Sequence, residues 1–227
     1  MFKILCQNLK YFVFLFILFL SSCNIDINNP TNSCISGSKI LKTEYRSPVS
    51  FNSISFASSG NLSITQGDTF SVQVESDENL LQYIITSVNG STLEIKNSIT
   101  ICPTKINIHV VLPQLKKISL TGSGNISTTE SFNFTDFEIV LSGSGNFNLS
   151  GKGHSGLLKL DGSGNINTEG IETTVSTAIL NGSGNIRVYA KERLTAVING
   201  TGNIYYKGNP YEKYFTINGS GQIINEP

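Results

Sequence analysis

The sequence predicts an all-β, single-domain protein folded as a parallel β-helix with coils of about 20 residues. Three observations support this fold class. A Gly-Ser-Gly-Asn motif recurs at nearly constant spacing, apolar and polar residues alternate around each copy, and no window places apolar residues at helical spacing. A repeat of this length is typical of stacked units in which each unit contacts only its neighbours.

The motif sets the length of a coil. Six strong copies occur, and the second glycines of successive copies are 21, 19, 20, 18 and 19 residues apart. The first glycines are Gly122, Gly143, Gly162, Gly182, Gly200 and Gly219, and the second are Gly124, Gly145, Gly164, Gly184, Gly202 and Gly221. A weaker copy, "SSGNL", contains Gly60. We predict that each copy marks one corner of a coil.

The alternation around each corner assigns its inner face. In "FEIVLSGSGNFNL", every second residue from Ile139 to Leu149 is apolar or glycine. Side chains in a strand point alternately to opposite faces, so both glycines fall on the buried parity. Two explanations for glycine remain open here: an inward bend that leaves no room for a Cβ, or a backbone that needs positive φ.

The other parity places two rows of polar residues on the surface. Coils stack about 4.8 Å apart, so equivalent residues of successive coils lie in line. One row is Ser123, Ser144, Ser163, Ser183, Thr201 and Ser220, and the other is Asn125, Asn146, Asn165, Asn185 and Asn203. Either this ladder binds a repetitive ligand such as a glycan, or its members bond to one another and hold the corner.

The N-terminus predicts export and lipid anchoring. Residues 11–20 form an apolar run of ten residues, which is shorter than the roughly 20 of a membrane span. The "LSSC" that follows resembles a bacterial lipobox, which would make residues 1–22 a lipoprotein signal peptide and Cys23 the acylated residue. An ordinary signal peptide cut nearby is the alternative. We expect residues 23–41 to be a tether, residues 42–227 the folded domain, and the outer membrane the location, since Asn24 follows the cysteine.

The charge balance and the cysteine and histidine spacing limit the possible partners and cofactors. The chain has 16 basic and 16 acidic residues, or about −2 after loss of Lys3 and Lys10, so nothing indicates nucleic acid. Cys34 and Cys102 remain after export, either paired or as free thiols. No Cys/His spacing indicates a metal, and we expect no metal and no cofactor.

No catalytic site is predicted. Asp161 is the one acidic residue in its row before the glycines and fits a turn residue that caps backbone N–H groups. His109 has no evident nucleophile nearby in sequence. His154 adjoins Ser155 on a glycine-rich loop, which orients no base–nucleophile pair. We therefore expect a protein that is not an enzyme.

The two ends of the repeat are less regular. Gly60 and Gly124 are 64 residues apart, which predicts about three coils without the motif, and Asn89-Gly90 indicates a hairpin turn. Near the other end, "YYKGNPYEKYF" contains Tyr205, Tyr206, Tyr211 and Tyr214. These rings either offer a stacking surface or close the C-terminal end of the stack, and closure is the preferred reading.

The order of these segments resembles a known family. "GNLSITQGD", "STLEIKN", "VVLPQLKKISLTGSGN", the further repeats, "YYKGNP" and "NGSGQI" resemble the putative auto-transporter adhesin, head GIN domain family across residues 45–225. The resemblance implies a β-helix related in shape to pectin lyases, which we expect to be right-handed, with no known catalytic residues and a role in adhesion.

These observations together predict a lipid-anchored binding or adhesion protein of the bacterial cell envelope. Its partners would be the membrane, through the anchor, and a glycan or another surface protein. A carbohydrate-active β-helix enzyme with an unrecognised site and a purely structural envelope protein are the alternatives.

Overall fold

The computed structural model describes residues 34–227, which are nearly all β: twenty strands, β1 to β20, and one 3-10 turn, η1 (Leu81–Tyr83). The expected signal peptide, Cys23 and the first part of the tether lie outside the described residues. Within residues 34–227, no helix is long and apolar enough to cross a membrane.

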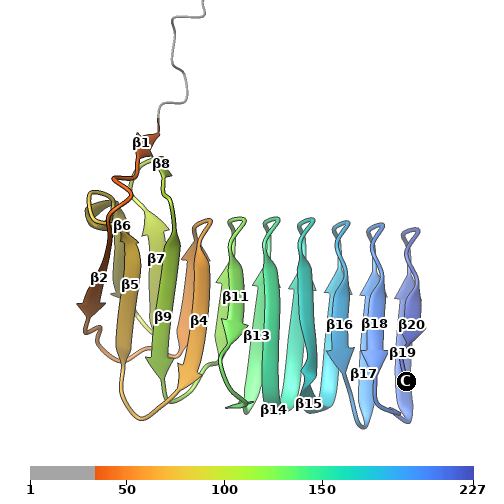
Figure 1. Ribbon diagram of the computed structural model, residues 1–227. Coiled ribbons are helices and arrows are strands. Elements are labelled where there is room, and N and C mark those ends of the chain that lie inside the picture. The colour runs from red at the N-terminus through yellow and green to blue at the C-terminus, as the bar shows by residue number, and fades with distance from the viewer. Residues whose placement is uncertain (1–33) are drawn as a thin grey trace, which may run out of the picture. The chain divides into compact units, whose positions relative to one another are not determined.

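Two facing rows of parallel strands build the stack, and the Gly-Ser-Gly corners join them along one edge (Figure 1). The row that leads into the corners contains β3 (Ser53–Ala57), β10 (Lys117–Leu120), β13 (Asp136–Leu141), the second halves of β14 (Asn146–Leu160) and β15 (Asn165–Leu180), β17 (Arg193–Ile198) and β19 (Glu212–Ile217). The row that leaves them contains β4 (Asn61–Gln66), β11 (Asn125–Thr128), the first halves of β14 and β15, β16 (Ile186–Tyr189), β18 (Ile204–Lys207) and β20 (Ile223–Asn225). β12 (Phe132–Asn133) pairs with β14.

The register between coils places equivalent residues side by side. Ile118 pairs with Ile54 on one side and Ile139 on the other, and Asn146 pairs with Asn125 and Asn165. The inner parity is buried, as at Leu160 and Ile166, while Lys159 on the outer parity is half-buried. The predicted single-domain parallel β-helix and its coil length are therefore confirmed.

The corner glycines are present because neighbouring coils touch there. A Cβ built on Gly164 would overlap the carbonyl oxygen of Gly145, and one on Gly184 would overlap that of Gly164. The same overlap with a carbonyl of the adjacent coil occurs at every strong copy of the motif. Positive φ among the described glycines is confined to Gly90, Gly151 and Gly208, so crowding and not backbone conformation explains the corners.

The region between Gly60 and Gly124 differs from the prediction. It contains one further coil, made of β7 (Thr92–Asn97), β8 (Ile101–Cys102) and β9 (Ile106–Leu112), which pairs in parallel with β3 and β4. The expectation of about three coils is wrong. The remaining strands run antiparallel: β5 (Ser71–Asp77) on β9, β6 (Ile84–Asn89) on β7, and β2 (Leu41–Arg46) on β5. The predicted hairpin turn joins β6 to β7, with φ of 58° at Gly90.

These antiparallel strands close the N-terminal end of the stack. The connection from β5 to β6 passes over the core and buries Leu80, Leu81 and Ile84. The Arg46 guanidinium donates hydrogen bonds to the carbonyl oxygens of Ile84 and Leu81, at 2.6 and 3.1 Å. The end of the core is thus covered by apolar side chains, and the carbonyls above them have partners.

Among residues 34–227, nothing covers the C-terminal end in the same way. β19 pairs with β17 and β20 with β18, and their other edges are open at the blue end of Figure 1. Phe215 and Ile217 occupy the inward parity yet are 41% and 50% exposed. The preferred reading of the tyrosine segment is wrong: Tyr211 and Tyr214 are exposed, while Tyr206 is buried below Phe215 with ring centroids 5.7 Å apart.

Candidate binding surface

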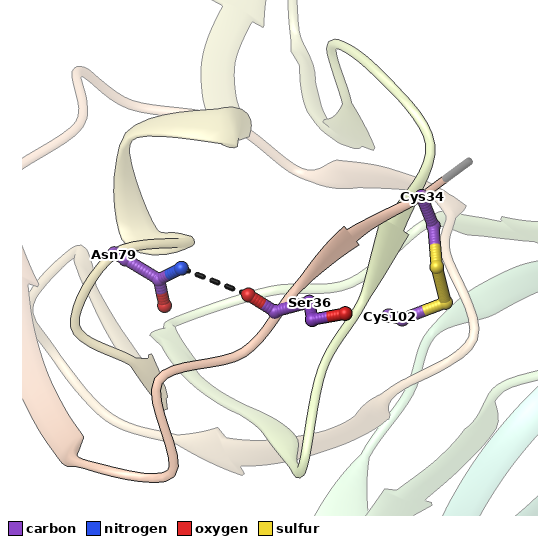
Figure 2. Close-up of a disulfide and its surroundings, with 4 residues drawn as sticks. All are labelled: Cys34, Ser36, Asn79 and Cys102. Carbon is purple, nitrogen blue, oxygen red and sulfur yellow. Dashed lines mark hydrogen bonds between the residues drawn. A yellow bond between two sulfur atoms is a disulfide. The ribbon is translucent and has the colours of Figure 1, made fainter.

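A disulfide fixes the start of the described chain. Cys34 and Cys102 are bonded, with Cα atoms 5.5 Å apart, which decides between the two states left open by the sequence. Figure 2 shows the bond beside β1 (Ile35–Ser36), whose Ser36 carbonyl accepts a hydrogen bond from the Asn79 amide at 2.9 Å. β1 pairs in parallel with β8. Residues 34–36 of the expected tether are therefore held to the folded domain by the disulfide and by the pairing of β1 with β8.

The asparagine row is a chain of hydrogen bonds that runs from coil to coil. Each side-chain amide donates to the amide oxygen of the preceding coil at 3.0 to 3.3 Å: Asn125 to Asn61, Asn146 to Asn125, Asn165 to Asn146, and Asn185 to Asn165. The backbone N–H groups of Asn203 and Gln222 continue the chain to the oxygens of Asn185 and Asn203. Most of the side-chain amides in this row therefore already make hydrogen bonds within the protein.

A second amide ladder lies on the other side of the glycines and was missed from the sequence. Asn181 donates to Asp161 at 2.6 Å, Asn199 to Asn181 at 2.8 Å, and Asn218 to Asn199 at 2.8 Å. Asp161 thus accepts from a side chain of the next coil, where a backbone cap was expected. The signal was present: an Asp or Asn precedes Gly-Ser-Gly or Gly-Thr-Gly in each of these four copies.

The hydroxyl row is the outermost part of each corner. Ser123, Ser144, Ser163, Ser183, Thr201 and Ser220 are all exposed. From the second of these onward, their backbone N–H groups donate to the first glycine of the preceding coil, as Ser163 does to Gly143 at 3.1 Å. The backbone is therefore fixed between the two amide ladders, and the hydroxyls face solvent.

A shallow groove of about 390 Å³ runs beside the asparagine row. Its polar lining comes from three successive coils and is uncharged except at one end: Asn146, Asn148, Asn165, Asn167, Asn185 and Arg187. Within it, Asn167 donates to Asn148 at 3.3 Å. The groove therefore presents amides at a regular spacing, with the strands of the sheet as its floor.

Arg187 forms a flat platform at the charged end of the groove. Its guanidinium carbon lies 4.4 Å from the centroid of the Tyr205 ring. The hydrogen bonds from Arg187 to Glu226, 2.6 Å from each carboxylate oxygen, raise the pKa of the guanidinium further above its ordinary value. Arg187 is thus held in place by a ring on one side and a carboxylate on the other.

The two histidines do not assemble a catalytic group. His109 has no nucleophile nearby in sequence, but pairing of β4 with β9 brings the Ser63 hydroxyl within 2.9 Å of His109 Nδ1. Thr65 Oγ1 lies 3.5 Å from the other ring nitrogen, where an orienting carboxylate would be needed. Ser155 donates to Asp136 at 2.6 Å and not to His154.

Charged groups elsewhere join neighbouring coils in pairs. Glu138 lies between Lys117 and Lys159, at 3.0 and 3.4 Å. Burial works to raise the pKa of Glu138, but the two lysines outweigh it, and the pKa lies below its ordinary value. Within residues 34–227, no group of three or more His, Cys, Asp or Glu side chains is placed to hold a metal ion.

The fold and this surface define a class of protein: a β-solenoid with polar ladders along its corners. The model of the putative auto-transporter adhesin, head GIN domain family matches residues 50–210. The chain belongs to this family. No curated protein is similar enough to the chain to match it.

Solved structures of bacterial proteins share the fold. A putative adhesin from Bacteroides fragilis NCTC 9343 is 26% identical with a TM-score of 0.71, and the match covers 85% of this chain and 100% of that one. A putative lipid binding protein from Parabacteroides distasonis ATCC 8503 is 26% identical with a TM-score of 0.62, over 86% and 100%. A putative adhesin from Parabacteroides merdae ATCC 43184, at 18% identity and a TM-score of 0.51, agrees in fold alone.

Proposed function

We propose that this protein is a lipid-anchored binding protein of the bacterial envelope that acts in adhesion by holding a glycan along the amide groove. The observation that carries the proposal is the groove itself, where Asn148 and Asn167 repeat on successive coils and Arg187 lies at one end. The family name and the adhesin among the similar structures support a role at the cell surface. The structure assembles no catalytic group around either histidine, which supports binding over turnover.

The chemistry of the groove suits a neutral sugar polymer. Amides can donate to and accept from sugar hydroxyls, and the flat Arg187–Tyr205 pair offers a stacking surface for a ring. The ladders hold the neighbouring backbone in one arrangement, so little conformational entropy is lost when a ligand binds. The coil spacing of about 4.8 Å is also close to the length of one sugar unit, which favours a repeating ligand.

Glycan binding is tested by substituting groove residues. We expect Asn167→Ala and Arg187→Ala each to weaken binding to the best ligand on a glycan array by about tenfold, measured by calorimetry. Lys191→Ala is the matched control, because Lys191 is also an exposed cation paired with a glutamate, Glu172, but lies outside the groove. Equal binding by all three variants would refute the groove as the site. Release of shorter sugars from the ligand would favour the enzyme alternative.

The anchor is tested separately. We expect Cys23→Ser to abolish labelling by acyl-chain probes and to release the protein from membranes, since acylation of Cys23 is the proposed attachment. Cys34→Ser is the control, because Cys34 is bonded to Cys102 and has no part in anchoring. Labelling and membrane retention that survive Cys23→Ser would contradict the lipoprotein assignment, while leaving the glycan proposal intact.

A further inference from the structure

We propose that the open C-terminal coil is an interface to a second copy of this chain. In this arrangement a two-fold axis passes beside Ser220, and β19 of each copy lies antiparallel to β20 of the other. The contact joins two stacks end to end and closes after two copies. It is independent of the proposed glycan groove.

The first argument is the contrast between the two ends of the stack. The N-terminal end is covered by antiparallel strands and by the buried Leu80 and Leu81. The C-terminal end exposes Phe215 and Ile217 on the inward parity, and the outer edges of β19 and β20 are unpaired within residues 34–227. An open strand edge with apolar inner residues is a template for pairing with another chain.

The second argument identifies the partner. The last corner has the same order of residue classes when read in either direction: Ile217-Asn218-Gly219-Ser220-Gly221-Gln222-Ile223. Rotation about an axis at Ser220 places Gly219 opposite Gly221 and Ile217 opposite Ile223. Within the stack, glycine must face the adjacent corner because a Cβ on Gly219 or Gly221 would overlap a carbonyl of the coil below. Both Cβ positions point toward the coil below, so the open face of this corner presents backbone without side chains to the second copy.

Strand directions agree with this symmetry. β19 runs toward the corner and β20 runs away from it, so rotation brings them together antiparallel, with inward residues still facing inward. The one inward charge of β19 is Lys213, whose ammonium lies 5.8 Å from the centroid of the Tyr206 ring and so already has a partner. The N-terminal end presents antiparallel strands, not a glycine corner, so head-to-tail stacking would not place two such corners against each other.

Cross-linking in cells tests the axis. With Ser220→Cys in the full chain, we expect a dimer on non-reducing gels after mild oxidation, because directly opposed antiparallel residues have Cβ atoms only about 4.5–5.5 Å apart. Ser183→Cys is the matched control, since Ser183 occupies the same exposed position two coils away. A Ser220→Cys chain that stays monomeric, or cross-linking equal to that of Ser183→Cys, would overturn the proposal.

Solution mass gives an independent test. For the full chain in detergent, we expect analytical ultracentrifugation to give a protein mass twice that of one chain. Ile217→Lys should raise the dissociation constant by about tenfold or more, and Thr216→Lys, on the outward parity of the same strand, should leave it unchanged. A monomeric wild-type protein would overturn the proposal. If the wild-type protein were monomeric and Ile217→Lys reduced its flotation with phosphatidylcholine vesicles, the C-terminal end of the stack would contact lipid instead.

Discussion

At the residue scale, the corner glycines are defined by what lies opposite them in the next coil. The carbonyl of Gly145 occupies the space that a side chain on Gly164 would need, and the same carbonyl accepts the Asn165 N–H at 3.3 Å. A methyl group at residue 164 would therefore push against backbone that is itself part of the ladder. Neither coil can move away without losing that hydrogen bond.

The smallest possible side chain tests this account. We expect Gly164→Ala to lower the free energy of unfolding by about 2–3 kcal/mol, because the Cβ meets backbone and not a movable side chain. Ser163→Ala, one residue earlier and exposed, should cost about 1 kcal/mol or less. Chemical denaturation of the two variants measures the difference. Equal costs would mean that the coils separate at the corner more easily than the structure indicates.

Gly90 provides the opposite case. Its φ is 58°, and a Cβ there would have nothing within 4 Å, so backbone conformation alone makes glycine favourable. We expect Gly90→Ala to cost only about 1 kcal/mol in unfolding free energy. A cost as large as that of Gly164→Ala would show that crowding and positive φ cannot be separated in this fold.

The inner parity of the glycines was predictable from the sequence, although only the second glycine of each corner is fully buried and the first is half-buried. The cause of the glycines was not predictable. Alternation from Ile139 to Leu149 was enough to place them on the inner parity. The choice between crowding and positive φ depends on how closely two corners about 20 residues apart approach each other. That distance is a property of the stack and leaves no mark within one repeat.

At the element scale, the amide ladders couple each coil to the next. Asn165 donates to Asn146 and accepts from both the backbone and side-chain N–H groups of Asn185. We expect Asn165→Ala to lower the free energy of unfolding by about 1–2 kcal/mol and to speed hydrogen exchange in the two adjoining coils first. Asn209→Ala, at an exposed position outside the ladders, is the control. Equal exchange in the two variants would contradict a structural role for the ladder.

The antiparallel strands at the N-terminal end show where pattern reading failed. β5 alternates buried Val72 and Val74 with partly exposed residues, as a coil strand does. Alternation identifies a half-buried strand but does not give the direction of its neighbour. The same limit applies to the site: Ser63 and His109 are 46 residues apart, and only the pairing of β4 with β9 brings them together.

The disulfide reinforces a short contact, because β1 and β8 pair over only two residues. It closes a loop with a sequence separation of 68 between Cys34 and Cys102. On the chain-entropy account, a loop of this length contributes about 4 kcal/mol to the free energy of unfolding. We expect Cys102→Ser to lose about that amount, and reductant to lower the unfolding temperature of the wild type but not of the variant. A wild-type unfolding temperature that reductant leaves unchanged would refute this.

At the scale of the whole molecule, stability should decrease in acid. The pKa of Glu138 lies below its ordinary value of 4.5 because the lysine pairs outweigh burial, and the pKa of Glu75 is lowered by Lys105 and Asn107. Groups whose pKa is lowered by folding stabilise the protein above their unfolded-state pKa, and that contribution is lost as the pH falls through the folded-state value.

We therefore expect the unfolding temperature to fall as the pH is lowered below about 4.5, with a smaller fall in Glu138→Gln. Calorimetry between neutral and acid pH measures both curves. Glu130→Gln is the matched control, because Glu130 is exposed on a turn and has no ion pair within residues 34–227. Curves that coincide for the wild type and Glu138→Gln would mean that the inter-coil ion pair contributes nothing.

The bond between Cys34 and Cys102 also determines where a pulling force would enter the fold. If Cys23 is anchored and a ligand is held in the groove, tension on the tether reaches the folded part at Cys34. Without the bond, the two ladder pairs of β1 and then β2, an edge strand paired with β5, would carry the load and could peel away one hydrogen bond at a time. With the bond intact, the load passes directly to β8, within a coil that pairs in parallel with β3 and β4. Mechanical strength of the attachment would then depend on the redox state of one covalent bond.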